Sequence, residues 1–356
     1  MSKVIFAGAG TAGHVEPALA VARWFRDQHP EIECAFLGTP EGVENSLVPA
    51  AGFPLTLIRK SPFPRRINLE LLSWPLRFWR TLRETKVLLG DVDLVIGFGG
   101  YVAAPAYLAA RRAGIPILAH EANAKMGMAN RLGVWCGATL LRGFAFRDQQ
   151  AVGIPLRKSI IDLASLTSEE RTNAKKQARL AFNLNPEKRT ILVFGGSLGS
   201  AKFNETVAQA QKDISELGFQ LIHAVGAKNQ LPQAQVGYVP LSYIDDMASA
   251  YAAADLVISR SGAVTVVETG VLGIFTVYVP LPIGNGEQAH NAQEVVARGG
   301  GELIPNAQFT SQWLGGNISR LMTQAQSWSS AHSRIDFPLN ASEEIATHIL
   351  KVLTHD

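Results

Sequence analysis

Short runs of apolar residues alternate with longer amphipathic stretches along nearly the whole chain. The short runs predict buried strands, and the stretches between them, polar on one side, predict helices. We expect helices at 17–26, with Pro17 in the first turn, and at 168–180. Regular alternation of this kind is typical of parallel sheets with helices on both faces. The expected strands are 4–7, 33–37, 93–98, 116–120, 190–194, 220–224, 256–259 and 275–279.

One pattern, an apolar strand followed by glycines, occurs twice. Residues 4–10 read Val-Ile-Phe-Ala-Gly-Ala-Gly, and residues 191–197 read Ile-Leu-Val-Phe-Gly-Gly-Ser. Each is typical of the first strand and turn of a doubly wound domain. A polar stretch and the turn at 153–155 interrupt the alternation before residue 157. We therefore predict an α/β fold of two Rossmann-like domains, 1–156 and 157–339, facing across a cleft, with a helix in 340–356 that could pack back on the first.

The composition supports this picture and excludes several classes of protein. The chain has 356 residues, enough for two domains, with 47% hydrophobic and 18% charged residues, as in globular proteins. Two cysteines, Cys34 and Cys136, are too few for a disulfide framework or a zinc site. A net charge of +3 is too small to indicate nucleic acid as a partner. We expect no signal peptide and no membrane-spanning helix.

Glycine-rich turns follow strands in both halves, at Gly10-Thr11-Ala12-Gly13-His14 and at Gly195-Gly196-Ser197. Beyond the carboxyl ends of parallel strands, glycines let the backbone approach a phosphate, and a helix amino terminus adds positive potential. The first turn lacks the three-glycine spacing of nicotinamide-binding proteins. His14 could accept a proton from an attacking hydroxyl, or it could only bond the backbone at a helix terminus. The residues alone leave both open.

Further polar segments also follow expected strands. In the first half they are Gly99-Gly100-Tyr101 and His120-Glu121-Ala122-Asn123, which favour substrate binding. In the second half, the small residues of 260–267 leave amides for a diphosphate, and Glu268 could accept from ribose hydroxyls or be a solvated helix-start glutamate. Residues 282–288 form another polar loop. Asp91 and Asp93 precede a strand, so we expect them at the edge away from ligands and predict no metal site.

The segment 59–86 differs in charge from the rest of the chain. It carries eight cations against two anions, interleaved with apolar and aromatic residues. Such a mixture predicts a surface that lies on an anionic bilayer with tryptophans at the headgroup level. Core packing must explain some of the aromatics, and a nucleic-acid patch is the less favoured alternative. The residues expected at the membrane are Leu72, Trp74, Phe78, Trp79 and Leu82.

Taken in order, these motifs resemble the MurG family of glycosyltransferases over nearly the whole chain. The resemblance implies a GT-B fold and an inverting transfer of N-acetylglucosamine from UDP-N-acetylglucosamine to the undecaprenyl-linked muramyl-pentapeptide precursor of peptidoglycan, without cofactor or metal. It also implies a peripheral position at the cytoplasmic face of the membrane, with other cell-wall synthesis proteins as further partners. The residues that carry the resemblance are 10–14, 99–102, 120–123, Asn130, 195–197, 244–247, 260–268, Gln288 and Asn291.

The resemblance also implies roles for individual residues. His14 is the first choice for the general base and Glu121 the second. Tyr101, His120 and Asn130 are expected to bind the acceptor. The donor is expected to contact Thr11, Ala12, Gly13, Asn123, Arg157, Ser197, Ile244, Ala263, Val264, Thr265, Val266, Val267, Glu268 and Gln288.

Four positions depart from the family pattern. Ala9 and Ala12 replace glycines in the first turn and are tolerable only at negative φ. Ile154 and Leu198 replace amide side chains and cannot supply their hydrogen bonds. These departures motivate one alternative, a catalytically silent scaffold that binds the donor at the membrane. The other alternative is a different GT-B glycosyltransferase or a sugar-nucleotide epimerase, which would not be expected to share the motifs at 99–101 and 120–123.

Overall fold

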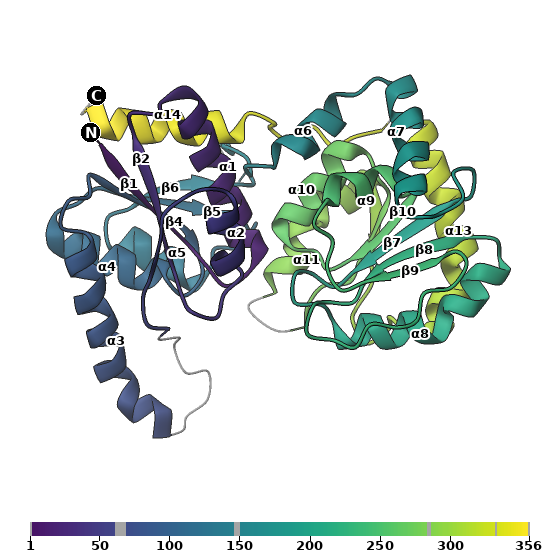
Figure 1. The fold of residues 1–356 in the computed structure, drawn as a ribbon, viewed down its shortest axis with the longest axis horizontal. Coiled ribbons are helices and arrows are strands. Elements are labelled where there is room, and N and C mark those ends of the chain that lie inside the picture. Colours follow the sequence, from purple (N-terminus) through teal and green to yellow (C-terminus); the bar gives the residue numbers. More distant parts are fainter. Residues whose placement is uncertain (1, 61–68, 146–149, 283–285, 332, 355–356) are drawn as a thin grey trace. The chain divides into compact units, whose positions relative to one another are not determined.

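The computed structural model describes residues 2–60, 69–145, 150–282, 286–331 and 333–354, with side chains omitted for 69–73 (Figure 1). Residue contacts divide the chain into two compact units, residues 1–157 with 338–356, and residues 158–337. Each unit contains a sheet of six parallel strands, in the orders β3-β2-β1-β4-β5-β6 and β12-β11-β10-β7-β8-β9. Both are the doubly wound order of nucleotide-binding domains, which confirms the predicted fold class.

The first unit alternates strands and helices and ends with a helix from the far end of the chain. Its strands are β1 (Lys3–Gly8), β2 (Glu33–Gly38), β3 (Leu55–Leu57), β4 (Leu94–Gly99), β5 (Ile117–Glu121) and β6 (Thr139–Arg142). Its helices are α1 (Ala12–Gln28), α2 (Glu44–Ala50), α3 (Leu69–Leu88), α4 (Ala103–Ala113), α5 (Met128–Trp135) and α14 (Ala341–Thr354).

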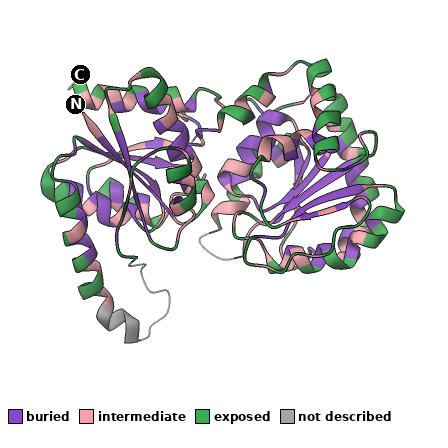
Figure 2. Cartoon of the chain, viewed as in Figure 1, coloured by how far each residue is buried: buried purple, intermediate pink, exposed green. Residues whose placement is uncertain are grey.

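Alternate residues of β1 build two different cores in this unit. Val4 and Phe6 belong to the cluster that contains α1 and, from α14, Ile345. Ile5 and Ala7 belong to the cluster on the other face, with α3 and α4. Because successive strand residues point to opposite faces, a continuous apolar strand needs helices on both sides. Figure 2 shows the resulting buried strands beneath more exposed helices.

The second unit repeats this arrangement. Its strands are β7 (Thr190–Phe194), β8 (Gln220–Ala224), β9 (Tyr238–Leu241), β10 (Leu256–Ser259), β11 (Thr276–Tyr278) and β12 (Gly301–Leu303). Its helices are α6 (Lys158–Ser165), α7 (Ser168–Ala181), α8 (Ala201–Glu216), α9 (Met247–Ala253), α10 (Ala263–Leu272), α11 (Glu287–Asn291), α12 (Gln293–Ala297) and α13 (Ser311–Ser330). Helices α8 and α13 cover one face, where Ile191 and Ile258 join their core cluster.

The prediction for the first helix was wrong in one detail. Helix α1 begins at Ala12, with Thr11 as an extended N-cap residue, so Pro17 lies in the second turn and not in the first. The glycine turn therefore leads directly into the helix. As a result, the first amides of α1 lie at the carboxyl edge of the first sheet.

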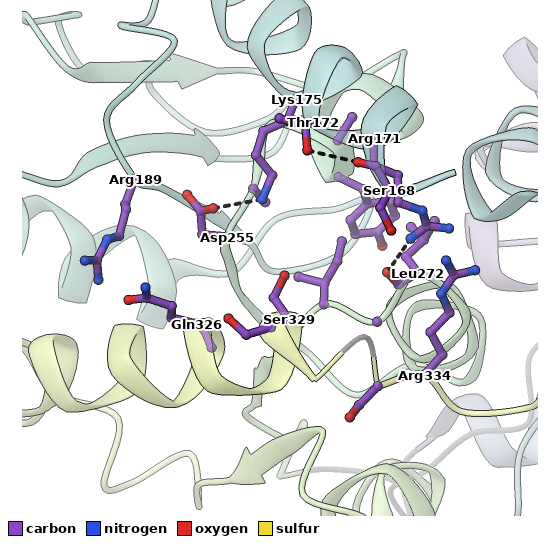
Figure 3. Close-up of a pocket in the computed structure, with 18 of the residues that line it drawn as sticks. Ser168, Arg171, Thr172, Lys175, Arg189, Asp255, Leu272, Gln326, Ser329 and Arg334 are labelled. Atoms are coloured by element: carbon purple, nitrogen blue, oxygen red, sulfur yellow. Dashed lines mark hydrogen bonds and ion pairs between the residues drawn. The ribbon is translucent and has the colours of Figure 1, made fainter. Parts of the chain in front are cut away.

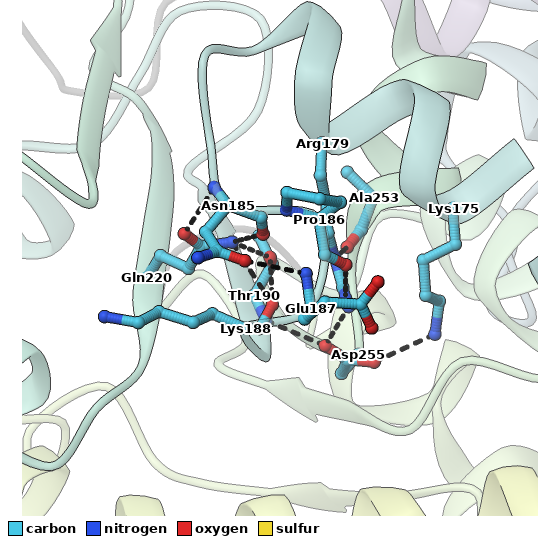
Figure 4. A network of polar contacts seen from close by, with 10 residues as sticks. All are labelled: Lys175, Arg179, Asn185, Pro186, Glu187, Lys188, Thr190, Gln220, Ala253 and Asp255. Carbon is cyan, nitrogen blue, oxygen red and sulfur yellow. Dashed lines mark hydrogen bonds and ion pairs between the residues drawn. The ribbon is translucent and has the colours of Figure 1, made fainter.

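Acidic residues at the amino edges of both sheets stabilise the fold. In the first unit, Asp93 accepts from the backbone of Lys3 at 2.8 Å, and Asp91 pairs with the Lys3 ammonium at 3.0 Å. In the second unit, Asp255 accepts from Lys175 at 2.9 Å, from Arg179 and from the Thr190 amide (Figure 4). These carboxylates thus lie at strand starts, and the position expected for Asp91 and Asp93 is confirmed.

Candidate active site

The turn between β1 and α1 is held from outside by a buried carboxylate. Gly10 has a φ of 97°, and its amide donates to Glu44 Oε2 at 2.9 Å. Thr11 Oγ1 lies 3.2 Å from His14 Nδ1, and the His14 amide donates to the Thr11 carbonyl at 3.0 Å. The turn therefore orients the imidazole by two contacts to one residue.

His14 is partly buried, and its ring lies against Gly99. A Cβ atom at Gly99 would lie 3.1 Å from His14 Cδ2, and Gly99 also has a φ of 92°, so this position favours glycine twice over. Burial lowers the pKa of His14, while the charge of Glu121, the Ala9 backbone and the charge of Glu44 raise it in part. The imidazole is therefore mainly neutral near pH 7, the form that a general base requires.

Ala9 and Ala12 have the negative φ that alanine requires at these positions. Among the described residues other than glycine, only Asn183 has a positive φ, so Ala9 and Ala12 occupy ordinary conformations. Ile154 is buried in the first unit, and Leu198 is 58% exposed. Neither can replace an amide hydrogen bond, but Ile154 contributes apolar packing instead.

Glu121 holds a loop together. Its Oε1 accepts from the amide and the side chain of Asn123 at 2.9 and 3.0 Å, and its Oε2 accepts from the Gly127 amide and the Asn130 side chain at 2.8 and 3.0 Å. The side chain is only 3% exposed. A carboxylate that already accepts four donors has no free lone pair directed at a substrate hydroxyl. Glu121 is therefore a poor general base, contrary to our second choice.

His120 and Asn130 support the same loop from beneath. His120 is completely buried, its Nε2 lies 2.9 Å from the Gly153 carbonyl, and burial lowers its pKa. Asn130 donates to the His120 carbonyl and accepts from Tyr107. His120 and Asn130 were predicted to contact the acceptor. Because both are buried, we assign them a supporting role instead. Tyr101 is 45% exposed and remains accessible to a ligand.

In the second unit, the predicted donor residues gather at the carboxyl edge of the sheet. The turn after β7 contains half-exposed Ser197, and Ile244, in the loop before α9, is only 6% exposed. Helix α10 begins after Gly262, whose extended backbone provides no side-chain cap. Its first amides have no carbonyl partner within the helix, so they can receive an anion. They belong to the predicted residues Ala263, Val264 and Thr265, whereas the amide of Val266, the next predicted residue before Val267, donates to the Gly262 carbonyl at 3.0 Å.

Glu268 lies in the second turn of α10 and is 3% exposed. Its Oε2 accepts from the Tyr251 hydroxyl at 2.9 Å. Burial excludes the alternative of a solvated helix-start glutamate. Gln288, in α11, accepts from the Leu281 amide at 2.9 Å and so ties α11 to the loop after β11, of which residues 283–285 lie outside the described chain.

Arg260 was not predicted as a site residue, although it follows β10 directly. Arg260 is 8% exposed, and its hydrogen-bond partners among the described residues are neutral groups. The partners are the Val279 carbonyl at 3.1 Å, the Pro280 carbonyl at 3.2 Å, Asn306 Oδ1 at 2.7 Å and Ser200 Oγ at 3.0 Å. A buried cation with neutral partners produces positive potential at this edge. A lone arginine directly after an apolar strand was the available signal.

Arg157 and Asn123, also predicted at the donor, lie in the first unit. Arg157 is its last residue before the second unit begins, and its Nη1 lies 3.9 Å from Glu16 Oε1. Asn123 is half-buried in the loop that Glu121 organises. Thr11 and Gly13 are exposed at the start of α1.

The residues predicted to lie at the membrane differ in how far they are buried. Leu82 is 7% exposed and belongs to the core cluster with α4, so its prediction as a membrane residue was wrong. Trp79 is 54% exposed, with the Arg83 guanidinium 5.5 Å from its ring centroid. Trp74 and Phe78 are half-buried and stack at 4.9 Å, and the Leu72 side chain lies outside the described residues.

The second unit has a cavity of about 420 Å³. Of the site residues described above in this unit, only the Glu268 partner Tyr251 lines it. The cavity lies at the amino edge, between α7 and α13, and Figure 3 shows Arg171, Lys175 and Arg334 around it. Arg171 donates to the Leu166 and Leu272 carbonyls at 3.0 and 3.2 Å, and Lys175 pairs with Asp255. Arg171 and Arg334 thus bond carbonyls near helix ends, and Lys175 is held in an ion pair, so the cavity is a structural feature of the fold.

The described residues offer neither a cluster of metal ligands nor a membrane-spanning helix. No three His, Cys, Asp or Glu side chains gather where a metal ion could be held. No helix of the described chain combines the length and apolarity that crossing a bilayer would require.

Known proteins match most of this chain. The glycosyltransferase family 28 N-terminal domain matches residues 4–140, and the C-terminal domain of that family matches residues 190–348. The chain is 49% identical over 316 residues to a protein of Corynebacterium glutamicum, covering 88% of this chain and 87% of that protein. A Corynebacterium diphtheriae protein is 44% identical over 362 residues, covering 99% and 98%. Both are named "UDP-N-acetylglucosamine--N-acetylmuramyl-(pentapeptide) pyrophosphoryl-undecaprenol N-acetylglucosamine transferase".

Solved structures agree with the fold. The crystal structure of Acinetobacter baumannii MurG has a TM-score of 0.70 and 28% identity, covering 99% of this chain and all of that chain. The calicheamicin glycosyltransferase CalG4 has a TM-score of 0.64 at 15% identity, covering 100% and 99%, and supports the fold alone.

Proposed function

We infer the function of this chain from the family to which it belongs: it is a member of the MurG family of glycosyltransferases. It transfers N-acetylglucosamine from UDP-N-acetylglucosamine to the lipid-linked muramyl-pentapeptide precursor in peptidoglycan synthesis. The observation that carries this conclusion is the identity of 44–49% to transferases so named, over 88–99% of the chain. The alternatives of an epimerase or an unrelated GT-B enzyme have no comparable support.

The chemical step that we propose is a single displacement at the anomeric carbon. The muramyl hydroxyl oxygen forms a bond to that carbon, its proton passes to His14, and the bond to the diphosphate oxygen breaks. The electron pair leaves with uridine diphosphate, so the configuration inverts. Support comes from the neutral state of His14 and from its orientation by Thr11. Glu121 is assigned to positioning, because its lone pairs are already used.

We propose that the second unit holds the donor. Glu268 would accept from the ribose hydroxyls, Ile244 would contact the uracil, and Gln288 would contact the sugar. Ser197 and the first amides of α10 would bind the diphosphate, with positive potential from Arg260. The supporting observations are the burial of Glu268, the uncapped start of α10 and the neutral partners of Arg260.

We also propose that α3 docks the protein on the cytoplasmic face of the membrane as a peripheral protein. Leu76 and Trp79 are more than half exposed, and Arg77, Arg80 and Arg83 are exposed beside them. Apolar groups at headgroup level and cations facing anionic lipid stabilise such binding together. Docking would bring the enzyme to its lipid-linked acceptor and to other cell-wall synthesis proteins.

The direct test is transfer of labelled N-acetylglucosamine from UDP-N-acetylglucosamine to purified lipid-linked muramyl-pentapeptide. With the lipid-linked acceptor we expect a product that carries the disaccharide. With water-soluble hydroxyl compounds as acceptors we expect no product. A chain that binds uridine diphosphate but forms no product would instead be the silent scaffold. Epimerised sugar nucleotide without transfer would identify the other alternative.

A further inference from the structure

Glu44, the first residue of α2, is a buried carboxylate that no sequence motif singled out. It is completely inaccessible to solvent. Its Oε2 accepts from the Gly10 amide at 2.9 Å, and its Oε1 accepts from the amide and the hydroxyl of Thr39 at 2.9 and 3.1 Å. Three donors from two different loops therefore converge on one side chain. Glu44 connects the end of β2 to the turn that carries His14.

Two glycines, Gly38 and Gly42, leave space for this carboxylate close to the backbone. A Cβ atom at Gly42 would lie 1.9 Å from Glu44 Oε2, and one at Gly38 would lie 2.7 Å from Glu44 Cγ. Such distances are far shorter than any real carbon contact, so both positions require glycine while Glu44 keeps this orientation. The loop between β2 and α2 is thus built around the carboxylate.

The bond to Gly10 also decides what the first glycine turn can bind. In a phosphate-binding turn, the amides point toward the anion. Here the Gly10 amide points to a carboxylate, and that negative charge repels a phosphate. The turn therefore differs in function from its counterpart after β7. Its structural effect is to fix the backbone from Gly10 to Thr11, on which the orientation of His14 depends.

Charged groups from two other elements act on His14. Glu121, on β5, and Glu44, on α2, both raise the pKa of His14, against the larger lowering by burial. Lys60 is the cation near Glu44, but its ammonium is bonded to Glu41 at 2.7 Å. A positive charge on His14 is therefore stabilised by two buried carboxylates, both of which are held by backbone amides.

We propose that Glu44 is a positioning residue for the transfer reaction. Its carboxylate fixes the turn of residues 10–14 through the Gly10 amide, and its charge stabilises the imidazolium that forms when His14 accepts the acceptor's proton. This inference rests on the proposed function, because it assigns a partner to the base of that reaction. Glu44 itself need not touch either substrate.

Two substitutions separate the reach of Glu44 from its charge. Glu44→Gln keeps the length and removes the charge, whereas Glu44→Asp keeps the charge and is too short to reach Gly10. We expect kcat to fall about tenfold to a hundredfold in each, with the KM for the donor nearly unchanged. The acid limb of the pH profile should move to lower pH in Glu44→Gln alone. Glu31→Gln, the same change at an exposed residue of this unit that contacts His29, should behave as the unsubstituted chain.

A second readout does not depend on activity. The imidazole signals of His14, assigned by their loss in His14→Ala, can be titrated by NMR in the full-length chain. A lower pKa of His14 in Glu44→Gln than in the unsubstituted chain would support the proposal. An unchanged His14 pKa together with an unchanged acid limb would overturn it. An unsubstituted chain without transfer activity would contradict the proposed function, while the titration would still decide the role of Glu44.

Discussion

The two glycine turns both join a strand to a helix, β1 to α1 and β7 to α8, but their electrostatic surroundings are opposite. The turn after β1 lies beside Glu44, which accepts a hydrogen bond from the Gly10 amide. The charge of Glu121 also raises the pKa of His14 in this turn, against the lowering by burial. The turn after β7 leads to Ser200, which accepts from the buried Arg260. A strand, turn and helix thus provide a scaffold, and the neighbouring side chains decide its chemistry. The first arrangement suits a proton acceptor, and the second suits a diphosphate.

The largest effect that separates the two turns is expected at His14. His14→Ala should lower kcat by about two to four orders of magnitude if this imidazole carries the proton. Transfer to the lipid-linked acceptor measures the change. Near-normal turnover would remove His14 from the role of base. Glu31, which is exposed and contacts His29, offers a control position whose substitution by Gln should leave turnover unaffected.

The next effect concerns the second turn. Arg260→Met should lower kcat/KM for the donor about a hundredfold, because it removes a buried positive charge and its bonds to three loops. Arg298→Met, at an exposed arginine paired with Glu294, is the matched control. Equal kcat/KM in both variants would mean that Arg260 does not act on the donor.

Helix α3, in the first unit, offers a contrast between a buried and an exposed residue of one helix. Leu82→Ala should lower the free energy of unfolding by about 2–5 kcal/mol, because it opens a cavity in the core. Trp79→Ser should leave stability nearly unchanged and weaken binding to vesicles that contain anionic lipid. Denaturant unfolding measures the free energy of unfolding, and vesicle sedimentation measures binding to the vesicles. Loss of vesicle binding in Leu82→Ala alone, with the protein folded, would contradict the assignment of the exposed face.

The smallest effect is a dependence of stability on pH that arises in the second unit. His223 is completely buried, and burial lowers its pKa to about 4. The unfolded chain, with an ordinary histidine pKa, takes up the proton first as pH falls below about 6.5, so acid favours unfolding. We expect this residue to lower the free energy of unfolding by about 2 kcal/mol between pH 7.5 and 5. Unfolding of His223→Gln should show a flatter profile, and an identical profile would contradict the assignment.

The sequence predicted the central strands of both sheets but missed β3, β6, β9 and β12. Those strands have only three or four residues. They also lie toward the sheet edges, where one neighbour suffices and a long apolar run is not needed. The predicted strands β10 and β11 are equally short, with four and three residues, but lie inside the sheet, where both faces are covered and the apolar pattern is strong. Short strands at the edge lack that pattern and resemble loops.

The candidate site was predictable where the chemistry is local. His14 and Glu268 lie in the first two turns of helices that follow strands, and their neighbours in sequence indicate their place. The partners that determine their state come from distant segments: Glu44 is 34 residues from Gly10, and Tyr251 is 17 residues from Glu268. For the same reason, the sequence could not reveal that Asn130 bonds Glu121 and the His120 carbonyl, or that the His120 ring lies against the Gly153 carbonyl.

The most direct test of the central claim is calorimetric titration of uridine diphosphate into the His14→Ala and Arg260→Met variants. If the second turn holds the diphosphate and the first handles the proton, His14→Ala should bind with an affinity within about twofold of the unsubstituted chain, since the two sites are independent. Arg260→Met should bind at least about tenfold more weakly. The reverse pattern, with affinity lost in His14→Ala and retained in Arg260→Met, would contradict the account.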